Sequence, residues 1–300
     1  MKKFAVVCAS GVGDALLMQI AANHLRNLGI DVVTFACPPM KDLADWFPGF
    51  TFLDQPKVEE IEKQFDSFDG IILQHDNSEK SKLIHALAKP VYTLYGSHFL
   101  PKHGPMRAGF DVKFDPSICM AENISYAMQT LFPEGESDLA NGITPPPHLI
   151  HRRFPNRIVI TPTSGSPLKN WPKNSFYQLY DQLEEAGWEP VFVVPPEETE
   201  EWGAKALPLL SDLATFLYES SYLIGNDSGP GHLASNLGIP TVIIGPSKEH
   251  LTFWRPGWHR GELAHPPNWT TKIKITKEKW KLFVSLNRVI KQFKKLTDIK

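Results

Sequence analysis

The sequence contains little cysteine and no strong excess of charge of either sign. Its three cysteines, Cys8, Cys37 and Cys119, are far apart and odd in number. They therefore favour neither a disulfide framework nor a zinc cluster, and they fit a reducing cytosol. The formal net charge of -2 excludes strong unaided attraction to nucleic acid, which needs a clearly basic surface. Nucleic acid is therefore not an expected partner.

Long hydrophobic runs are also missing. No stretch approaches the roughly 20 apolar residues that cross a bilayer, and the apolar run at 4–10 is broken by Gly11 before any signal-peptide cleavage site. With 300 residues, of which 42% are hydrophobic, the chain can fill the cores of two ordinary domains. We expect a soluble globular protein of the cytoplasm.

Apolar strands alternate with helical patterns in both halves of the chain, which is typical of parallel sheets covered by helices. The expected strands are 4–9, 32–36, 70–73, 90–94, 157–161, 189–194, 222–225 and 240–244. A helix opened by Asp14 should end at Gly29, and further helices are expected at 173–186, 213–220 and 230–237. A proline-rich linker at 133–155 separates the halves. The sequence thus predicts an α/β fold with two doubly wound sheets.

The end of the chain, from Lys272, is basic and carries an apolar face. We expect a terminal helix that packs back on the domains with its lysines in water. A membrane surface is the alternative partner, because anionic lipid attracts such a face. The expected division is 1–150, 151–272 and a basic amphipathic helix at 273–300.

Three loops that follow expected strands carry the polar residues of interest. Gly11-Val12-Gly13-Asp14 follows the first strand, and Asp227-Ser228-Gly229-Pro230-Gly231-His232 follows the strand at 222–225. Each leads into a helix, whose first N–H groups attract anions. The third loop, 161–172, offers hydroxyls and Lys169, which can reach a diphosphate. Such loops gather at the carboxyl ends of the strands, and together they indicate an enzyme that acts on a nucleotide diphosphate.

These motifs resemble glycosyltransferase family 9, which includes the heptosyltransferases of lipopolysaccharide core assembly. The matching pieces are Gly11-Val12-Gly13-Asp14, Lys169-x-Trp171-Pro172, Asn226-Asp227-Ser228-Gly229-Pro230-x-His232-Leu233-Ala234 and Gly238-Ile239-Pro240. The resemblance implies the GT-B architecture, in which two Rossmann-like doubly wound domains face a central cleft. It also implies an inverting sugar transfer without an obligatory metal, and the sequence has no Asp-x-Asp.

By this resemblance Asp14 is the general base, and Lys169 stabilises the departing nucleotide diphosphate. The implied donor-binding residues are Thr163, Ser164, Ser166, Glu198, Asp227, Ser228, Gly229 and His232. Weaker acceptor candidates are Gly13, His75 and Asp76. Several alternatives stay open. Glu197 competes with Glu198 for the ribose, Asp14 and Asp227 also suit helix capping, and His232 and Lys169 also suit a structural histidine and a solvated surface charge.

The resemblance further implies a nucleotide-sugar donor, with ADP-heptose as the leading choice, and a glycan or glycolipid acceptor such as lipopolysaccharide core. If the basic C-terminal segment meets a membrane surface, the expected partner is the inner membrane, in a peripheral contact. The segment 54–69 is acidic and would repel a phosphorylated acceptor, unless nearby cations offset it, namely Lys80, Lys82, Lys89, Lys102 and Arg107. A nucleotide-sugar epimerase or hydrolase and a non-catalytic nucleotide- or glycan-binding relative remain alternatives.

Overall fold

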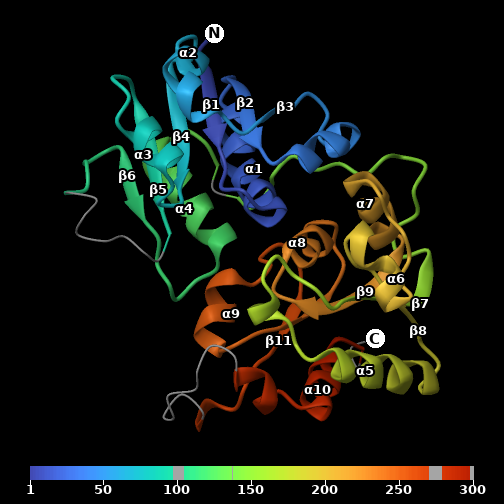
Figure 1. Cartoon of the computed structure of the whole chain (residues 1–300). Helices are drawn as coiled ribbons and strands as arrows, with labels where there is room; N and C mark the ends of the chain where they lie inside the picture. Colours follow the sequence, from blue (N-terminus) through green and yellow to red (C-terminus); the bar gives the residue numbers. More distant parts are fainter. Residues whose placement is uncertain (97–104, 137, 270–278, 298–300) are drawn as a thin grey trace. The chain divides into compact units, whose positions relative to one another are not determined.

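The computed structural model describes residues 1–96, 105–136, 138–269 and 279–297. The chain divides into two compact units, residues 1–144 and 145–300, and the division lies within the proline-rich segment at 133–155. In Figure 1 the N-terminal unit runs from blue to green and the C-terminal unit from yellow-green to red. Every strand expected from the apolar runs is present in one of the two sheets.

The N-terminal unit is built on a parallel sheet of six strands in the order β3-β2-β1-β4-β5-β6. The strands are β1 (Lys3–Val7), β2 (Asp31–Ala36), β3 (Thr51–Asp54), β4 (Gly70–His75), β5 (Val91–Tyr95) and β6 (Asp111–Lys113). The order reverses direction between β1 and β4. In doubly wound sheets this reversal point is where ligands bind.

Helices cover both faces of this sheet. Short helices α2 (Ile61–Phe65) and α3 (Glu79–His85) share a buried core with one face of β1, β2 and β4. On the other face, α1 (Val12–Asn27) packs against α4 (Met120–Leu131), and the ring of Phe4 contacts Phe132 just beyond α4. Shorter 3-10 turns are η1 (Pro38–Trp46) and η2 (Val58–Glu60). As expected, α1 stops before Gly29, whose φ of 75° suits glycine, but the helix begins two residues before Asp14.

The C-terminal unit contains a parallel sheet of five strands in the order β11-β10-β9-β7-β8. They are β7 (Phe154–Thr161), β8 (Glu189–Phe192), β9 (Ser220–Asn226), β10 (Thr241–Ile244) and β11 (Gly261–Ala264). This order reverses between β7 and β9. The two strands approach closely at that point. A Cβ on Gly225 would lie only 1.8 Å from Thr161 Oγ1, so the side of β9 that faces Thr161 has room only for glycine there.

Two pairs of helices cover the faces of the second sheet. One face shares a core with α5 (Lys173–Glu185) and α10 (Leu286–Thr297), which contact each other. On the other face lie α7 (Leu210–Tyr218) and α8 (Gly229–Asn236), and α8 packs so closely that a Cβ on Gly231 would meet Ile243 at 2.9 Å. The remaining short elements are η4 (Pro167–Lys169), η5 (Pro196–Glu198), α6 (Thr199–Trp202), α9 (Lys248–Trp254) and η7 (Lys279–Phe283).

The C-terminal segment packs back on its own unit, which confirms that expectation. Helix α10 buries Val289, Phe293 and Leu296, and the ring of Phe293 lies 5.3 Å from that of Trp188. Its lysines Lys291, Lys294 and Lys295 are exposed. Of the segment expected as one helix, 273–278 and 298–300 lie outside the described residues, and η7 precedes α10. Within the described part of the chain, no helix is long and apolar enough to span a membrane.

Candidate active site

Asp14 lies in the first turn of α1, directly beyond the carboxyl end of β1. The N-cap of this helix is Gly11 and Asp14 is the third helical residue, so Asp14 is not the N-cap residue. A Cβ on Gly11 would lie 2.8 Å from Asp14 Oδ2, and the φ of Gly11 is −88°. Glycine at this position therefore provides room for the carboxylate and is not required by the backbone. The other oxygen, Oδ1, accepts a hydrogen bond of 2.7 Å from Gln74 Nε2.

The weaker acceptor candidates lie at the same edge of the N-terminal sheet. Gly13 is the second residue of α1, and His75 ends β4 with its ring 5.0 Å from that of Tyr95. The carboxylate of Asp76 accepts from the backbone N–H and the hydroxyl of Ser78, at 3.0 and 2.6 Å. Burial raises the pKa of Asp76, but these hydrogen bonds and one from Ser81 outweigh it, so the pKa is lowered. Asp76 thus stabilises the turn into α3.

Several cations that were candidates to offset the acidic segment are used inside the N-terminal unit. Arg107 forms a 2.8 Å ion pair with Asp111, whose side chain is 2% exposed. Lys89 Nζ donates to the backbone carbonyl of Phe68 at 2.9 Å. Lys80 donates to Gln55 Oε1 near the carboxyl end of β1. Lys102 lies outside the described residues.

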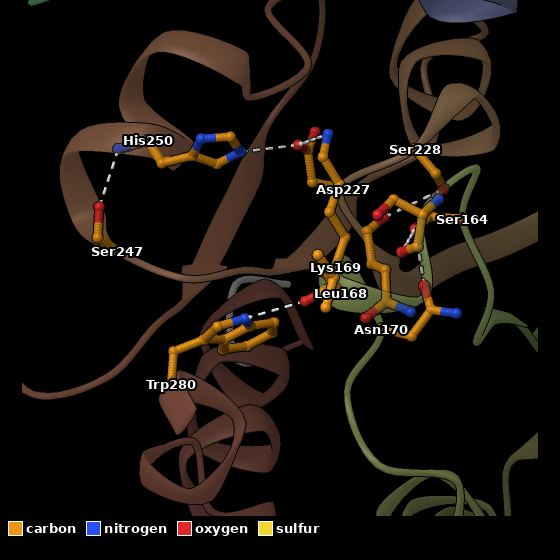
Figure 2. A network of polar contacts seen from close by, with 11 residues as sticks. Ser164, Leu168, Lys169, Asn170, Asp227, Ser228, Ser247, His250 and Trp280 are labelled. Atoms are coloured by element: carbon orange, nitrogen blue, oxygen red, sulfur yellow. Dashed lines mark hydrogen bonds and ion pairs between the residues drawn. The ribbon is translucent and has the colours of Figure 1, made fainter. Parts of the chain in front are cut away.

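The C-terminal unit brings three charged or polar side chains together at the reversal point of its sheet (Figure 2). Lys169 ends η4 after β7, Asp227 follows β9, and His250 lies in α9 after β10. Asp227 Oδ2 accepts from Lys169 Nζ at 3.2 Å and from His250 Nε2 at 3.0 Å. Side-chain exposure is 45% for Lys169, 29% for His250 and 7% for Asp227. The cluster is therefore anchored in the protein at Asp227 and open to solvent at Lys169.

The charge state of Asp227 follows from its two partners. Burial alone raises the pKa of this carboxyl, but the hydrogen bond from His250 and the positive charge of Lys169 lower it overall. Asp227 is therefore an anion at neutral pH and holds the Lys169 ammonium in place. It precedes Ser228, which is the N-cap of α8, so Asp227 is not the N-cap residue either.

Sequence reasoning missed His250. The backbone N–H of His250 donates to Ser247 Oγ at 3.1 Å, which caps α9 and fixes the start of this helix. The only signal for His250 in the sequence is that it follows shortly after β10. That strand ends at the same edge of the sheet as β7 and β9. No motif marks His250.

The loop that carries Lys169 is held from two sides. Buried Asn226 donates to the carbonyl of Pro162 at 2.6 Å and accepts from the N–H of Trp171 at 3.0 Å. The indole of Trp171 donates to the carbonyl of Val284 at 2.8 Å, and that of Trp280 to the carbonyl of Leu168 at 3.3 Å. Figure 2 shows Trp280 beside the Lys169 turn. The C-terminal segment thus supports the loop.

The other predicted donor residues lie on neighbouring loops. Ser164 Oγ lies 2.7 Å from Asn170 Oδ1 and 3.0 Å from the carbonyl of Ser166, so this hydroxyl is engaged within its own loop. Thr163 precedes it, and Ser166 is the N-cap of η4. Gly229 begins α8, and buried His232 lies in its first turn. After β8, Glu198 is half-buried and Glu197 is exposed.

Two doubly wound units, each with its polar residues at the carboxyl ends of strands, define the GT-B class. Residues 148–262 match the profile of glycosyltransferase family 9 (heptosyltransferase), which is the family that the motifs of this chain resemble. Lipopolysaccharide heptosyltransferase 3 of Escherichia coli K12 is 25% identical over 114 residues, which are 33% of this chain and 33% of the relative. The aligned region therefore spans about a third of that curated relative.

Solved structures extend the likeness of fold to the whole chain. A family 9 glycosyl transferase from Veillonella parvula is 20% identical with a TM-score of 0.69, covering 100% of this chain and 98% of its own. The E. coli ADP-heptose lipopolysaccharide heptosyltransferase II is 19% identical with a TM-score of 0.69, covering 99% and 98%. A third similar structure is an iron-containing dodecameric glycosyltransferase of E. coli. It is 14% identical with a TM-score of 0.58, and the match covers 99% of this chain and 76% of that one. The described residues of this chain contain no group of three or more His, Cys, Asp or Glu side chains that could hold a metal.

Proposed function

We propose that this protein is an inverting glycosyltransferase that moves heptose from ADP-heptose to a cell-envelope saccharide such as lipopolysaccharide core. The cluster of Lys169, Asp227 and His250 carries this proposal. It lies at the reversal point of the second sheet, where a nucleotide is expected, and within the region that matches family 9. The similar proteins support heptose as the sugar and ADP as the nucleotide, since they include a lipopolysaccharide heptosyltransferase 3 and an ADP-heptose lipopolysaccharide heptosyltransferase II.

The C-terminal unit is proposed to bind the donor. Lys169 and the first N–H groups of α8, at Ser228 and Gly229, would neutralise the diphosphate as it departs, and loss of one such contact commonly costs about 10²–10³ in rate. Asp227 would hold Lys169 for this purpose, and His232 would contact the donor from the same helix. The hydroxyl loop, with Thr163, Ser164 and Ser166, and the ribose partner Glu198 complete the proposed site.

Asp14 of the N-terminal unit is proposed as the base. The acceptor oxygen attacks the anomeric carbon, the bond from that carbon to the diphosphate oxygen breaks, and the hydroxyl proton passes to Asp14. Attack from the face opposite the leaving group inverts the anomeric centre. Because Lys169 and the start of α8 carry the charge of the leaving group, this scheme needs no obligatory metal.

The test is release of ADP from ADP-heptose with and without lipopolysaccharide core oligosaccharide. Asp14→Asn should retain stabilisation of the protein by ADP and lose transfer by about 10²–10⁴. Unchanged transfer in Asp14→Asn would exclude the proposed role. Release that is indifferent to every glycan would instead identify an epimerase or hydrolase, and no release at all would identify a nucleotide- or glycan-binding relative.

We further propose that the protein works in the cytoplasm, at the inner face of the inner membrane when its acceptor is a glycolipid. Because the apolar face of α10 is buried, such contact would use the exposed lysines alone. Binding to vesicles that contain anionic lipid should then disappear at high salt. Binding that survives high salt would contradict this electrostatic contact.

A further inference from the structure

Ala9, two residues beyond β1, is bonded through both of its backbone groups to glutamine side chains. Its N–H donates to Gln74 Oε1 at 2.9 Å, and its carbonyl accepts from Gln55 Nε2 at 3.3 Å. The far end of each glutamine holds a charged side chain, since Gln74 donates to Asp14 and Gln55 accepts from Lys80. The sequence offers no motif for either glutamine.

The amide of Gln74 has one orientation that satisfies both of its neighbours. The N–H of Ala9 is a donor, so the amide oxygen must face it, and the NH₂ group must then face Asp14. Gln74 Nε2 donates to Asp14 Oδ1 at 2.7 Å, and the side chain is 7% exposed in β4 beside β1. A hydrogen bond to a carboxylate is about twice as strong as one between neutral groups. Rotation of the amide would place its oxygen against the carboxylate and lose both contacts.

We propose that Gln74 is a positioning residue for Asp14. The inference rests on the proposed role of Asp14 as the base, and Gln74 acts through that carboxylate without touching substrate. Its amide fixes the direction of the carboxylate above Gly11, and it favours the charged form because a donated N–H stabilises the carboxylate over the acid. The first effect aims the carboxylate, and the second keeps it unprotonated before the acceptor hydroxyl arrives.

Other titratable groups near Asp14 must be separated from this effect. Burial raises the pKa of the Cys8 thiol well above its usual value, with the charge of Asp14 adding to it, and burial likewise raises the pKa of Cys37. Burial lowers the pKa of Lys80, and the charge of Asp76 acts against that change. The thiols and the ammonium titrate well above the range of a carboxyl. Asp76 does titrate in that range, so the signal of Asp14 has to be assigned.

The first experiment needs no substrate. The side-chain carboxyl carbons of ¹³C-labelled aspartates are titrated by NMR in the full chain, and the signal that disappears in Asp14→Asn is assigned to Asp14. In Gln74→Leu, its midpoint should rise by about one to two pH units, since the lost bond is to a charged group. Gln55→Leu is the control. It loses the bonds of Gln55 to the carbonyls of Cys8 and Ala9, at 3.0 and 3.3 Å, and its contact with Lys80, but it leaves the Gln74 amide on Asp14. There the midpoint should stay where it is in the unchanged protein.

Gln74→Glu distinguishes positioning from a purely structural role. A carboxylate retains an acceptor for the N–H of Ala9, but it replaces the donor to Asp14 with a like charge. We expect kcat for transfer from ADP-heptose to lipopolysaccharide core to fall about 10–100-fold, KM for the donor to change less than about twofold, and the acidic limb of the pH profile to move to higher pH. Wild-type kcat and pH profile in Gln74→Glu would overturn the inference, as would an unmoved Asp14 midpoint in Gln74→Leu. If instead Asp14→Asn retains transfer, the proposed function itself fails.

Discussion

The ion pair between Lys169 and Asp227 is expected to stabilise the protein more than the exposed pair between Lys173 and Glu201. The exposed pair is shorter, with an N–O distance of 2.8 Å against 3.2 Å. Exposure decides the comparison, because the side chain of Asp227 is 7% exposed and that of Glu201 is 65% exposed. Water screens the exposed pair and weakens its attraction strongly. The buried pair is longer by 0.4 Å, and this difference weakens its attraction much less.

The magnitude follows from these distances and environments. Two unit charges 3.2 Å apart attract by about 5 kcal/mol at an effective dielectric constant of about 20, whereas a pair at 2.8 Å in bulk water gains about 1.5 kcal/mol. Desolvation of Asp227 offsets most of the larger figure, and Lys169 is 45% exposed. We therefore expect a net coupling of about 1–2 kcal/mol for Lys169–Asp227 and about 0–0.5 kcal/mol for Lys173–Glu201.

Double-mutant cycles measure both couplings in one protein. The first uses Lys169→Met and Asp227→Asn, and the second uses Lys173→Met and Glu201→Gln, each followed by urea unfolding. Tryptophan fluorescence is a suitable signal because seven of the eight tryptophans follow residue 145, in the unit that contains both pairs. A coupling for Lys169–Asp227 no larger than that of the exposed pair would refute the reasoning.

The same cycle predicts a pH dependence. The pKa of Asp227 is lowered in the folded protein, because the hydrogen bond from His250 and the charge of Lys169 outweigh the effect of burial, which alone would raise it. A carboxyl with a lowered folded pKa contributes stability above its unfolded pKa of about 3.9 and loses it as the pH falls through the folded value. The coupling should therefore be the same at pH 7 and pH 5 and shrink below about pH 4. Growth of the coupling on acidification would contradict this sign.

Three substitutions give further predictions. Gly11→Ala places a Cβ 2.8 Å from Asp14 Oδ2, so we expect transfer to fall by about 10²-fold while thermal stabilisation by ADP is retained. Gly225→Ala places a Cβ 1.8 Å from Thr161 Oγ1 and 2.7 Å from its carbonyl oxygen, and should lower the free energy of unfolding in urea by about 1–3 kcal/mol. Lys169→Met should reduce the rise in melting temperature caused by ADP and leave the response to adenosine, which lacks phosphate, nearly unchanged.

Each glycine change has a control in the same unit. A Cβ on Gly96, in the N-terminal unit, or on Gly165, in the C-terminal unit, meets no atom of the described residues within 4 Å, and neither residue has a positive φ. Gly96→Ala should therefore keep transfer, and Gly165→Ala should keep the free energy of unfolding within about 0.5 kcal/mol of the unchanged protein. If either control behaves like its test variant, the close contact is not the cause.

Much of the fold could be predicted because its central strands are continuous apolar runs. β1, β4, β9 and the second half of β7 are buried on both faces, so their sequences lack alternation and stand out. The short strands β3, β6 and β11 were missed. They lie at or beside a sheet edge with mostly exposed or half-buried residues, and such strands have no apolar run to mark them.

The site was predictable only where one loop carries its own motif. Lys169 and Asp227 fall in loops with glycine, proline and hydroxyl residues, and both reach the reversal point of the second sheet. His250 and Gln74 were missed because their roles depend on strand order. Gln74 is 60 residues from Asp14 in sequence, and only the pairing of β4 with β1 brings them together. The local sequence around Gln74 or Asp14 carries no information on which strands pair in the sheet.

Asp14 and Asp227 are both aspartates that follow a central strand, and their partners give them different chemistry. Asp227 binds the ammonium of Lys169 and the imidazole of His250, which lower its pKa and make it a poor proton acceptor. Such a carboxylate orients a cation for an anionic ligand. Gln74 gives Asp14 a hydrogen bond from a neutral amide, which fixes direction without adding a positive charge to oppose proton uptake. A base needs that second kind of partner. The exchange Gln74→Lys puts a cation against Asp14 and also removes the acceptor for the Ala9 N–H. It should abolish transfer, and retained transfer would show that the neutrality of this contact is irrelevant.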